Sequence, residues 1–471
     1  MGLGRNTKLS NLSKEETLRF DVKFLDYYDE INYDYYTFKD LFDFVEYKKL
    51  DISQLDNFKY VEIGDITKLG DINPIKLSFD DRNEINEDYF KKIEKGDIIK
   101  PKKGDILLSK IRPYLNKNIL IRNEDCYFTK AMIQIRPKIN SKLFYYLLRI
   151  VFFELINAVS RQGKGYPTLK ENDLRSIKFP KLIIDETLLN EVKLISSIEP
   201  IEEEIQKLKS QKKEHLEIIN EVFSDQLKFD WEKFNTLKNK KVFSSNLLEF
   251  SNNKDTRFSY KFHNRENKYL YKFLESKTNK KVKDFISEPI VLGKSISPSL
   301  YDENGEHYYI AMSSIKNYRF DTEGCKKVGI KYFTDNENKS IQLNDILLAR
   351  SGEGTIGKVA LIEDEDVEGI FADFTMRIRL TNYNQLFAYY YFRSDFFQYL
   401  VYTHKKGLGN NTNIFPNQIQ EFPLLDFNLD YQQILVNKIK TQIDNQKEID
   451  KQIEEKQNEI SSIIEECIKA K

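Results

Sequence analysis

A glycine-bearing segment has residue types and spacing that could bind a phosphate. Residues 352–358, Gly-Glu-Gly-Thr-Ile-Gly-Lys, fit the G-x-x-x-x-G-K pattern of nucleotide-binding loops and follow a predicted strand at 346–349. Such loops continue with a Ser or Thr that binds magnesium and with a helix whose N-terminus faces the phosphates. Here Val359 follows, and 359–362 has the composition of another strand. We therefore interpret the segment as a glycine-bearing β-hairpin without nucleotide chemistry.

Other signatures of catalysis or metal binding are missing from the sequence. It holds no Asn/Asp-Pro-Pro-aromatic methyltransferase motif, and 454–456, the closest approach to a nuclease Glu-x-Lys, falls on a predicted helix. Three cysteines without CxxC spacing and four histidines without an HExxH motif indicate neither a disulfide framework nor a zinc site. We expect no metal, no cofactor and no enzymatic activity in this chain.

Two loops in each half of the chain carry binding chemistry instead. The first follows an Asp-Ile-Leu-Leu strand, at 109–117 and again at 350–358; the second follows a predicted helix, at 160–168 and again at 403–411. Both second loops contain Gly-x-Gly with basic neighbours, which allows a phosphate chain to approach the backbone. Arg, Asn, Ser and Thr side chains hydrogen-bond to base edges, so the loops predict contact with double-stranded DNA. The candidate residues are Ser109, Lys110, Arg112, Lys117, Arg161, Lys164, Tyr166, Thr168, Arg350, Ser351, Glu353, Thr355, Lys358, Lys405, Lys406, Asn410 and Asn411.

The two halves of the chain repeat one another. The segment 104–110 returns as 344–350, a shift of 240 residues, and the flanking matches stay in order along the chain. This order predicts a tandem duplication of one globule followed by one helix. A molecule with two related globules should bind something with two related halves. The flanking matches are 19–24 with 257–262, Tyr60-Val61-Glu62-Ile63 with Tyr308-Tyr309-Ile310-Ala311, 143–146 with 386–389, and Phe179-Pro180 with Phe422-Pro423.

Each globule should combine short strands with one amphipathic helix. Runs such as 105–108, 132–135, 346–348 and 376–380 have strand composition, and apolar residues at helical spacing predict helices at 143–159 and 386–402. The expected fold is therefore α+β, with two tandem mixed α/β domains.

A heptad pattern follows each globule. Apolar residues recur at alternating steps of three and four, and Pro200 predicts a break or kink in the first of these helices. The two helices should pair as an antiparallel coiled coil, although pairing with a partner's helices fits the pattern equally well. Gln446 and Lys456 at seam positions would fix the register. The expected boundaries are 1–183 for the first domain, 184–227 for the first helix, 228–428 for the second domain and 429–471 for the second helix.

Composition and charge limit the class of protein. With 471 residues, 40% of them hydrophobic and 13% aromatic, the chain can bury extensive cores. No apolar run reaches the roughly 18 to 20 residues of a membrane span, and the first residues lack the apolar core of a secretory signal, so we expect a cytoplasmic protein. The net charge is zero, yet 91–138 holds thirteen Lys or Arg against five Asp or Glu. A basic surface on a neutral chain suits contact with phosphates.

Three stretches resemble one known family. They are the Arg-Phe-x-x-Lys-Phe opening of each half, the segment 345–362, and the segment 422–439 that leads into the second predicted helix. Over essentially its full length, the chain resembles the specificity subunit of a type I restriction-modification system. The first half departs from the pattern at 110–113 and at 181–186, which suggests that the two domains read different sequences.

The resemblance implies a mechanism. Each globule would be a target-recognition domain in the major groove, and the coiled coil would hold the two apart, so the DNA target would be split and asymmetric. The chain would dock two methyltransferase subunits, which bind S-adenosylmethionine and methylate DNA, and restriction subunits that use ATP and magnesium in phage defence. Two alternatives remain: a coiled-coil scaffold whose globules bind protein, and a self-sufficient nuclease or methylase.

Overall fold

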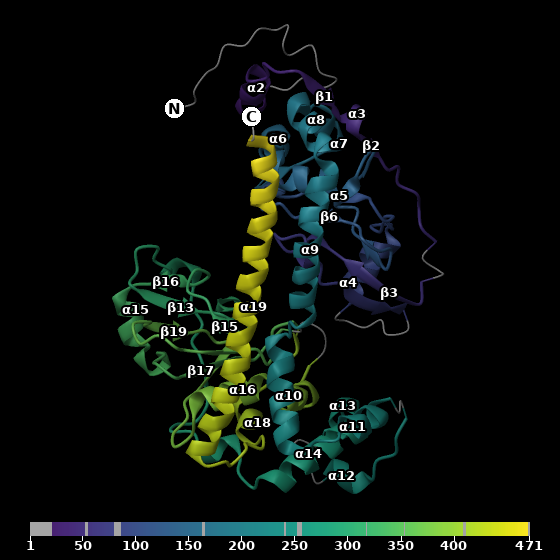
Figure 1. Cartoon of the computed structure of the whole chain (residues 1–471). Helices are drawn as coiled ribbons and strands as arrows, with labels where there is room; N and C mark the ends of the chain where they lie inside the picture. The colour runs from purple at the N-terminus through teal and green to yellow at the C-terminus, as the bar shows by residue number, and fades with distance from the viewer. Residues whose placement is uncertain are drawn as a thin grey trace. The chain divides into compact units, whose positions relative to one another are not determined.

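The chain folds into two compact units with α/β character. The computed structural model describes residues 21–51, 55–79, 86–162, 165–239, 242–251, 257–316, 318–352, 354–407 and 411–469. Unit one comprises residues 1–211 and 450–471, and unit two comprises residues 212–449. Each unit contains small sheets and several helices, among which the helix α19 (Leu429–Lys469) contributes residues to both units (Figure 1). None of the described helices is both long and apolar enough to cross a membrane.

Unit one contains a four-stranded and a three-stranded sheet. Their strand orders are β2-β8-β5-β6 and β4-β3-β7, and only the β3–β7 pair is parallel within these two sheets. All four side chains of β5 are buried, which explains its unbroken apolar sequence. The strands are β2 (Phe42–Phe44), β3 (Asn57–Val61), β4 (Ile75–Ser78), β5 (Ile106–Ser109), β6 (Ile119–Leu120), β7 (Cys126–Phe128) and β8 (Met132–Pro137).

Unit two repeats these sheets. Its strand orders are β12-β20-β17-β18 and β16-β13-β19. As in unit one, a single pair within these two sheets, β13–β19, is parallel. The predicted duplication is therefore present in the strand topology. The strands are β12 (Val291–Leu292), β13 (His307–Ile310), β16 (Lys326–Val328), β17 (Ile346–Ala349), β18 (Val359–Leu361), β19 (Gly369–Phe371) and β20 (Thr375–Ile378).

The parallel pairs correct one predicted match by a single residue. Tyr60 is opposite Tyr127 in β7, and Tyr309 is opposite Ile370 at the same step of its ladder. Tyr60 and Tyr309 are both buried, and each hydroxyl donates to a backbone carbonyl, at 2.9 and 2.7 Å. Tyr60 therefore corresponds to Tyr309 and not to Tyr308. Two adjacent tyrosines made both alignments possible from sequence, whereas the pleat allows only one to face the core.

In both copies of the repeated Asp-Ile-Leu-Leu segment, a buried aspartate forms an ion pair with an arginine that reaches solvent. In unit one, Nε of Arg136 lies 2.7 Å from Oδ1 of Asp105; in unit two, Nε of Arg379 lies 2.8 Å from Oδ1 of Asp345. Both aspartates are fully buried. Because a buried carboxylate needs a partner, each pair ties the central strand to its neighbour β8 or β20.

The predicted amphipathic helices are each divided. In unit one, α5 (Ser141–Tyr146) passes through a π-helical turn at Leu147–Val151 into α6 (Phe153–Val159). In unit two, α16 (Gln385–Arg393) and α17 (Asp395–His404) are separated by Ser394. Asparagine caps both N-termini, since Asn140 accepts from Leu143 N–H at 3.1 Å and Asn384 accepts from Phe387 N–H at 2.9 Å. These caps fix where each helix begins.

A break at Pro200, one of the two outcomes predicted from sequence, is wrong. The helix α9 (Glu191–Ser210) runs through Pro200 without a break. Tertiary contacts on both sides of the proline hold it: Ile198 and Ile201 are buried, and Glu202 accepts hydrogen bonds from Tyr146 and Arg122 at 2.5 and 2.6 Å. These contacts offset the backbone hydrogen bond that proline removes.

The helical tract is interrupted elsewhere. Two further helices flank α9: α8 (Lys181–Leu189) precedes it, and α10 (His215–Leu227) follows after a break at 211–214. Within unit two, the backbone N–H of Lys213 in this break donates to Oε1 of Gln446 on α19 at 2.7 Å. Within unit one, Nζ of Lys456 on α19 lies 2.8 Å from Glu204 on α9. The two polar seam residues predicted from sequence therefore both make specific contacts.

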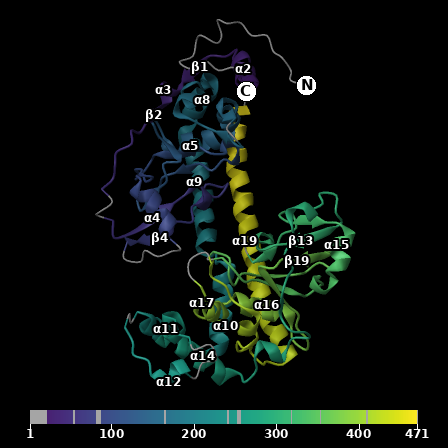
Figure 2. The ribbon, with the colours of Figure 1, turned by 180° about the vertical axis from the view of Figure 1, so that it is seen from behind.

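The remaining elements complete the two units, seen from behind in Figure 2. The smaller strands form antiparallel pairs, β1 with β11, β9 with β10 and β14 with β15. In unit one the remaining elements are α2 (Val22–Asp29), β1 (Tyr35–Thr37), α3 (Phe38–Leu41), α4 (Glu87–Glu94), β9 (Arg161–Gln162), β10 (Pro167–Thr168), α7 (Glu171–Arg175) and β11 (Lys178–Pro180). In unit two they are α11 (Trp231–Lys238), α12 (Leu247–Ser251), α13 (Tyr260–His263), α14 (Arg265–Lys277), β14 (Ile315–Lys316), β15 (Arg319–Phe320), α15 (Ile330–Asp335) and α18 (Pro416–Gln420).

Candidate nucleic-acid interface

The two candidate loops of unit one lie against each other. The N–H of Leu169 donates to the carbonyl of Lys110 at 2.8 Å, and the N–H of Arg112 donates to the carbonyl of Pro167 at 2.9 Å. An isolated bridge pairs Ile111 with Thr168 of β10. Segments that are about 55 residues apart in sequence thus form one surface, which we call loop pair one (109–117 and 161–168).

Unit two builds the same arrangement from different residues. The N–H of Ile414 donates to the carbonyl of Arg350 at 2.9 Å, and the N–H of Gly352 donates to the carbonyl of Thr412 at 3.3 Å. An isolated bridge pairs Ser351 with Asn413. These bonds match those of unit one step by step, and they define loop pair two (350–358 and 403–413). The sequence predicted two loops in each half, and in each unit the structure joins them.

Arg112 and Gly352 occupy equivalent places in the two loop pairs. Both have a left-handed backbone, with φ of 51° at Arg112 and 83° at Gly352. Glycine adopts this conformation without strain, whereas a side chain with Cβ makes it costly. The shift of 240 residues read from the sequence already pairs these two positions, although only unit two has a glycine there.

Loop pair one presents an arginine and two tyrosines to solvent. The guanidinium carbon of Arg112 lies 5.3 Å from the ring centre of Tyr166. Arg112, Tyr114 and Tyr166 are all exposed. A guanidinium over an exposed aromatic ring suits stacking on bases and contact with phosphates.

Loop pair two holds its arginine more firmly. Nε of Arg350 donates to the carbonyl of Asp373 at 2.8 Å, and Nη1 donates to Oδ1 of Asn413 at 3.1 Å. The guanidinium carbon lies 5.3 Å from the ring centre of Phe374 and 5.9 Å from that of Phe415. Both rings are exposed, Phe374 by 45% and Phe415 by 37%. The sequence interpretation missed Phe374, Phe415 and Asn413; a phenylalanine between polar residues at 373–375 was the available signal.

Several candidate residues of unit one are used inside the fold. The hydroxyl of Ser109 is buried and donates to the carbonyl of Ile111 at 2.7 Å. Nζ of Lys110 donates to the carbonyl of Lys130 at 2.7 Å, and burial lowers the pKa of Lys110. Nζ of Lys117 donates to the carbonyl of Ile63 at 2.9 Å. A further candidate, Arg161, is paired through Nε with Asp173 at 2.6 Å.

Candidate hydroxyls of unit two also bond within their own loop pair. Thr355 donates to the carbonyl of Ser351 at 2.6 Å, and the buried Ser351 donates to the carbonyl of Thr412 at 3.3 Å. These side chains shape the loops. The partly exposed Lys358 ends the turn before β18, where 359–361 pairs antiparallel with β17. The segment 352–358 therefore belongs to a β-hairpin, as the sequence predicted.

The basic residues of the second loop are clustered. Nζ of Lys405 lies 5.5 Å from the ring centre of Tyr402, and Lys406 exchanges two backbone hydrogen bonds of 2.7 Å with Asn413. Asn411 is exposed nearby in the same loop. Three further candidates, Lys164, Glu353 and Asn410, lie outside the described residues.

Many basic residues of 91–138 are balanced by acids or aromatic rings. Lys92 and Arg122 each lie 2.6 Å from a glutamate oxygen, and Nζ of Lys130 lies 3.2 Å from the ring centre of Tyr47. A cavity of about 850 Å³ in unit one brings together Lys39, Lys110, Lys130, Lys138 and Arg175, with Asp43, Glu46 and Glu171 in the same wall. The basic excess read from sequence is thus smaller at the surface than its count suggests.

The part of the chain that the structure describes holds no cluster of three or more His, Cys, Asp or Glu that could bind a metal ion. Cys126 is a free, buried thiol whose pKa is raised to about 11 by burial.

The chain is similar to solved structures of type I restriction-modification proteins. One is a chain from a study of complex assembly and conformational transition of the type I R-M system: 13% identity, 93% of this chain and 97% of that chain covered, TM-score 0.40. The HsdS subunit from Thermoanaerobacter tengcongensis gives 13% identity, the same coverages and a TM-score of 0.35. The S subunit from M. genitalium gives 12% identity, coverages of 93% and 96%, and a TM-score of 0.37.

These solved structures are of the kind that the sequence resembles. No protein-family model matches the chain, and no curated protein matches it either. At this identity and these TM-scores we base the function on the chain's own residues.

Proposed function

We propose that this chain is the DNA-specificity subunit of a type I restriction-modification complex. The observation that carries the proposal is the duplicated loop pair: in each unit the same backbone bonds join two loops and place an arginine beside exposed aromatic rings. DNA is a ligand with two readable half-sites, and a duplicated site suits it.

The side chains of loop pair two suit distinct parts of DNA. An arginine held by its Nε can direct its remaining donors at O6 and N7 of guanine. The faces of Phe374 and Phe415 suit the methyl group of thymine, while Lys405 and Lys406 suit phosphates. Loop pair one offers Arg112, Tyr114 and Tyr166 instead, so the two units would read different half-sites, giving a split and asymmetric target.

The helices would act as the spacer between half-sites. In unit two residue 213 bonds to residue 446, and in unit one residue 204 pairs with residue 456, so position along α19 rises as position along the first tract falls. This order favours antiparallel pairing of the two helical tracts as a coiled coil.

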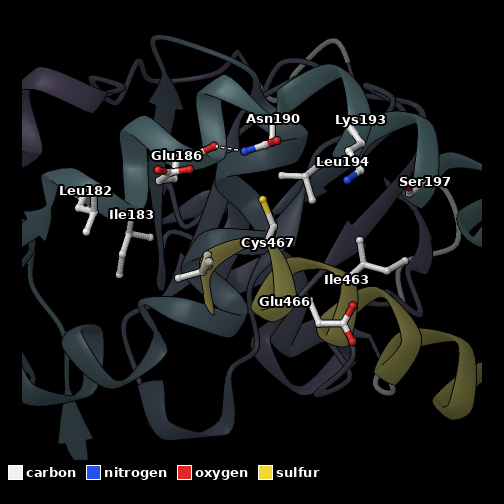
Figure 3. Close-up of a pocket in the computed structure, with 11 residues that line it drawn as sticks. Leu182, Ile183, Glu186, Asn190, Lys193, Leu194, Ser197, Ile463, Glu466 and Cys467 are labelled. Atoms are coloured by element: carbon white, nitrogen blue, oxygen red, sulfur yellow. Dashed lines mark hydrogen bonds between the residues drawn. The ribbon is translucent and has the colours of Figure 1, made fainter. Parts of the chain in front are cut away.

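Methyltransferase subunits would dock on unit one, where α8 and α9 meet the last turns of α19. A groove of about 470 Å³ lies between α8, α9 and the last turns of α19, lined by Leu194, Ile463 and Cys467 among others (Figure 3). Leu182 in its wall and Leu189 and Val192 beside it are strongly exposed. Exposed apolar side chains of this size favour a protein partner. S-adenosylmethionine, ATP and magnesium would be bound by the methyltransferase and restriction subunits.

A domain exchange tests the proposal. Residues 1–180 are replaced by the corresponding domain of a relative, since Pro180 ends β11 and α8 begins at Lys181. Methylated adenines are then mapped in cells that also express the methyltransferase. We expect one half of the target to change and the other to persist; a change in both halves, or no methylation change at all, would contradict independent reading.

The neutral net charge favours one alternative, a scaffold whose units bind protein. Titrating the chain into duplex DNA at increasing salt separates the two. For a specificity subunit, the logarithm of the binding constant should fall linearly with the logarithm of the salt concentration, because phosphate contacts release counterions. A scaffold gives no salt-dependent complex.

A further inference from the structure

The Arg-Phe-x-x-Lys-Phe segment that opens the second half, residues 257–262, is not used by the proposed function. The structure places it against the end of α17, where the second loop of loop pair two begins. Nη1 of Arg257 donates to the carbonyl of His404 at 2.7 Å, and Nη2 donates to the carbonyl of Lys405. One guanidinium thus binds two consecutive carbonyls at the helix end.

These carbonyls need partners from outside the helix. The last carbonyls of an α-helix have no intrahelical donor, and the helix end carries partial negative charge, so a guanidinium is favourable there. Nε2 of Gln418 on α18 donates to the carbonyl of His404 as well, at 2.6 Å. The start of the loop is therefore held by two separate elements.

A network of rings and amides fixes this segment against α17. The guanidinium carbon of Arg257 lies 5.0 Å from the ring centre of Phe262, and that ring lies 4.9 Å from the ring of His404. The buried Asn267 accepts from the hydroxyl of Thr403 at 2.9 Å and donates to the carbonyl of Phe262 at 2.7 Å. The contacts of the segment 257–262 thus orient Arg257 toward the carbonyls at the start of the loop.

The contacts continue to the arginine of loop pair two. Arg257 binds the carbonyl of Lys405, and Lys406 is the next residue. The backbone N–H of Lys406 donates to the carbonyl of Asn413, and the N–H of Asn413 donates to the carbonyl of Lys406. The side chain of Asn413 in turn accepts from Arg350. The path from Arg257 to Arg350 therefore consists of hydrogen bonds joined by two short covalent steps, the peptide bond from Lys405 to Lys406 and the side chain of Asn413.

We propose that Arg257 is a positioning residue, which fixes residues 404–406 and, through them, Asn413, so that Lys405, Lys406 and Arg350 face the DNA together. The proposal rests on the proposed function for its consequence at DNA. Its counterpart in the first half, Arg19, lies outside the described residues.

A mutant cycle in the full-length chain tests this. The variants are Arg257→Ala, Arg257→Lys, the double Lys405→Ala/Lys406→Ala and the triple combination, with Arg379→Lys as control because its ion pair with Asp345 lies outside the loop pair. We expect Arg257→Ala to weaken non-specific DNA binding on the order of tenfold and to lower the salt slope by about one unit. On non-specific DNA the triple variant should bind no worse than the double, because the lysines are already lost and Arg350 acts mainly on discrimination between targets.

A second measurement does not depend on DNA. In the wild type, the amides of Lys406 and Asn413 each donate to the other residue's carbonyl. In Arg257→Ala both amides should exchange hydrogen faster. Arg257→Lys should fall between wild type and alanine, and Arg379→Lys should leave these amides unchanged. Multiplying effects in the triple variant, or unchanged exchange at 406 and 413 in Arg257→Ala, would overturn the positioning role. If the wild type binds no DNA, the proposed function fails, while the exchange data still decide whether Arg257 holds the loop.

Discussion

Nη1 of Arg350 and Oδ1 of Asn413 lie 3.1 Å apart, which joins the two loops of loop pair two through their side chains. Nε of the same guanidinium is bonded to Asp373, and Nη2 makes no hydrogen bond with any residue that the structure describes. A guanidinium held at Nε and Nη1 presents Nη2, together with the second hydrogen of Nη1, in a defined direction, as contact with guanine requires.

We therefore predict that Arg350 and the lysine pair act differently. Replacing Lys405 and Lys406 by alanine should weaken binding to all sequences alike and lower the log-log salt slope by up to about two units. Arg350→Ala should mainly reduce discrimination between targets, by about 1 to 3 kcal/mol at one base pair, and Arg350→Lys should not restore it because lysine lacks the fork. Competition titrations with single-base variants measure both effects. Selective loss in the lysine variant together with uniform loss in Arg350→Ala would reverse the assignment.

The exposed phenylalanines should contribute to specific binding. Phe374→Ala or Phe415→Ala should weaken binding to the cognate half-site by about 1 to 2 kcal/mol and leave the salt slope unchanged, because an apolar contact releases no counterion. Leucine at either position should preserve part of the affinity. Replacing thymine by uracil at each position of the half-site shows which methyl group is read. Equal losses on cognate and random DNA would exclude a base contact for these rings.

Arg112 should trade stability for binding. Its left-handed backbone costs about 1 to 2 kcal/mol relative to glycine, so Arg112→Gly should stabilise unit one by about that amount. The same change removes the guanidinium over Tyr166 and should weaken DNA binding. Alkylation of the buried Cys126, followed site by site by mass spectrometry, reports the opening of unit one. Faster alkylation in Arg112→Gly would show that the side chain stabilises the fold more than its backbone strains it.

His404 should make the stability of unit two depend on pH. Burial lowers its pKa to about 4, with Arg257 adding to the effect, whereas the unfolded chain binds this proton near pH 6.5. Above about pH 6.5, His404 is neutral in both states and does not reduce the free energy of unfolding. As the pH falls toward 4, the unfolded chain binds the proton and the folded chain does not, so the free energy of unfolding decreases. At pH 5 the decrease is about 2 kcal/mol. Trp231, the one tryptophan of the chain, lies in unit two and reports its unfolding in urea. His404→Gln should flatten the profile between pH 7.5 and 5, and an equally steep profile in this variant would assign the effect to other groups.

Sequence reasoning succeeded where a local pattern decides the structure. The strands β5, β8, β17 and β20 were predicted because their buried apolar runs are bounded by turn residues, and Val359 was enough to exclude a nucleotide loop. It failed where distant residues decide. The helix α9 continues through Pro200, where Glu202 accepts hydrogen bonds from Tyr146 and Arg122, two residues that are far away in sequence.

The proposed binding surface divides in the same way. Basic and glycine-bearing loops could be recognised from composition, which gave Lys405, Lys406 and Arg350. Residues that join the surface through tertiary contact could not: Phe374 and Asn413 meet Arg350 only after the sheet has formed. Ser109 and Arg161 had suitable chemistry, yet their hydrogen bonds turn inward.

If the loop pairs read DNA as proposed, the backbone bonds that join the two loops in each unit would limit how new specificities can arise. A change in the length of one loop displaces the other, since Leu169 is bonded to Lys110 and Ile414 to Arg350. Single substitutions are therefore expected to adjust a half-site only slightly, whereas recombination that transfers a complete unit carries both loops and their mutual fit. Diversity in such a protein would grow by exchange of whole modules, and a pool of n modules at each of two places would give on the order of n² targets without any loop having to be rebuilt.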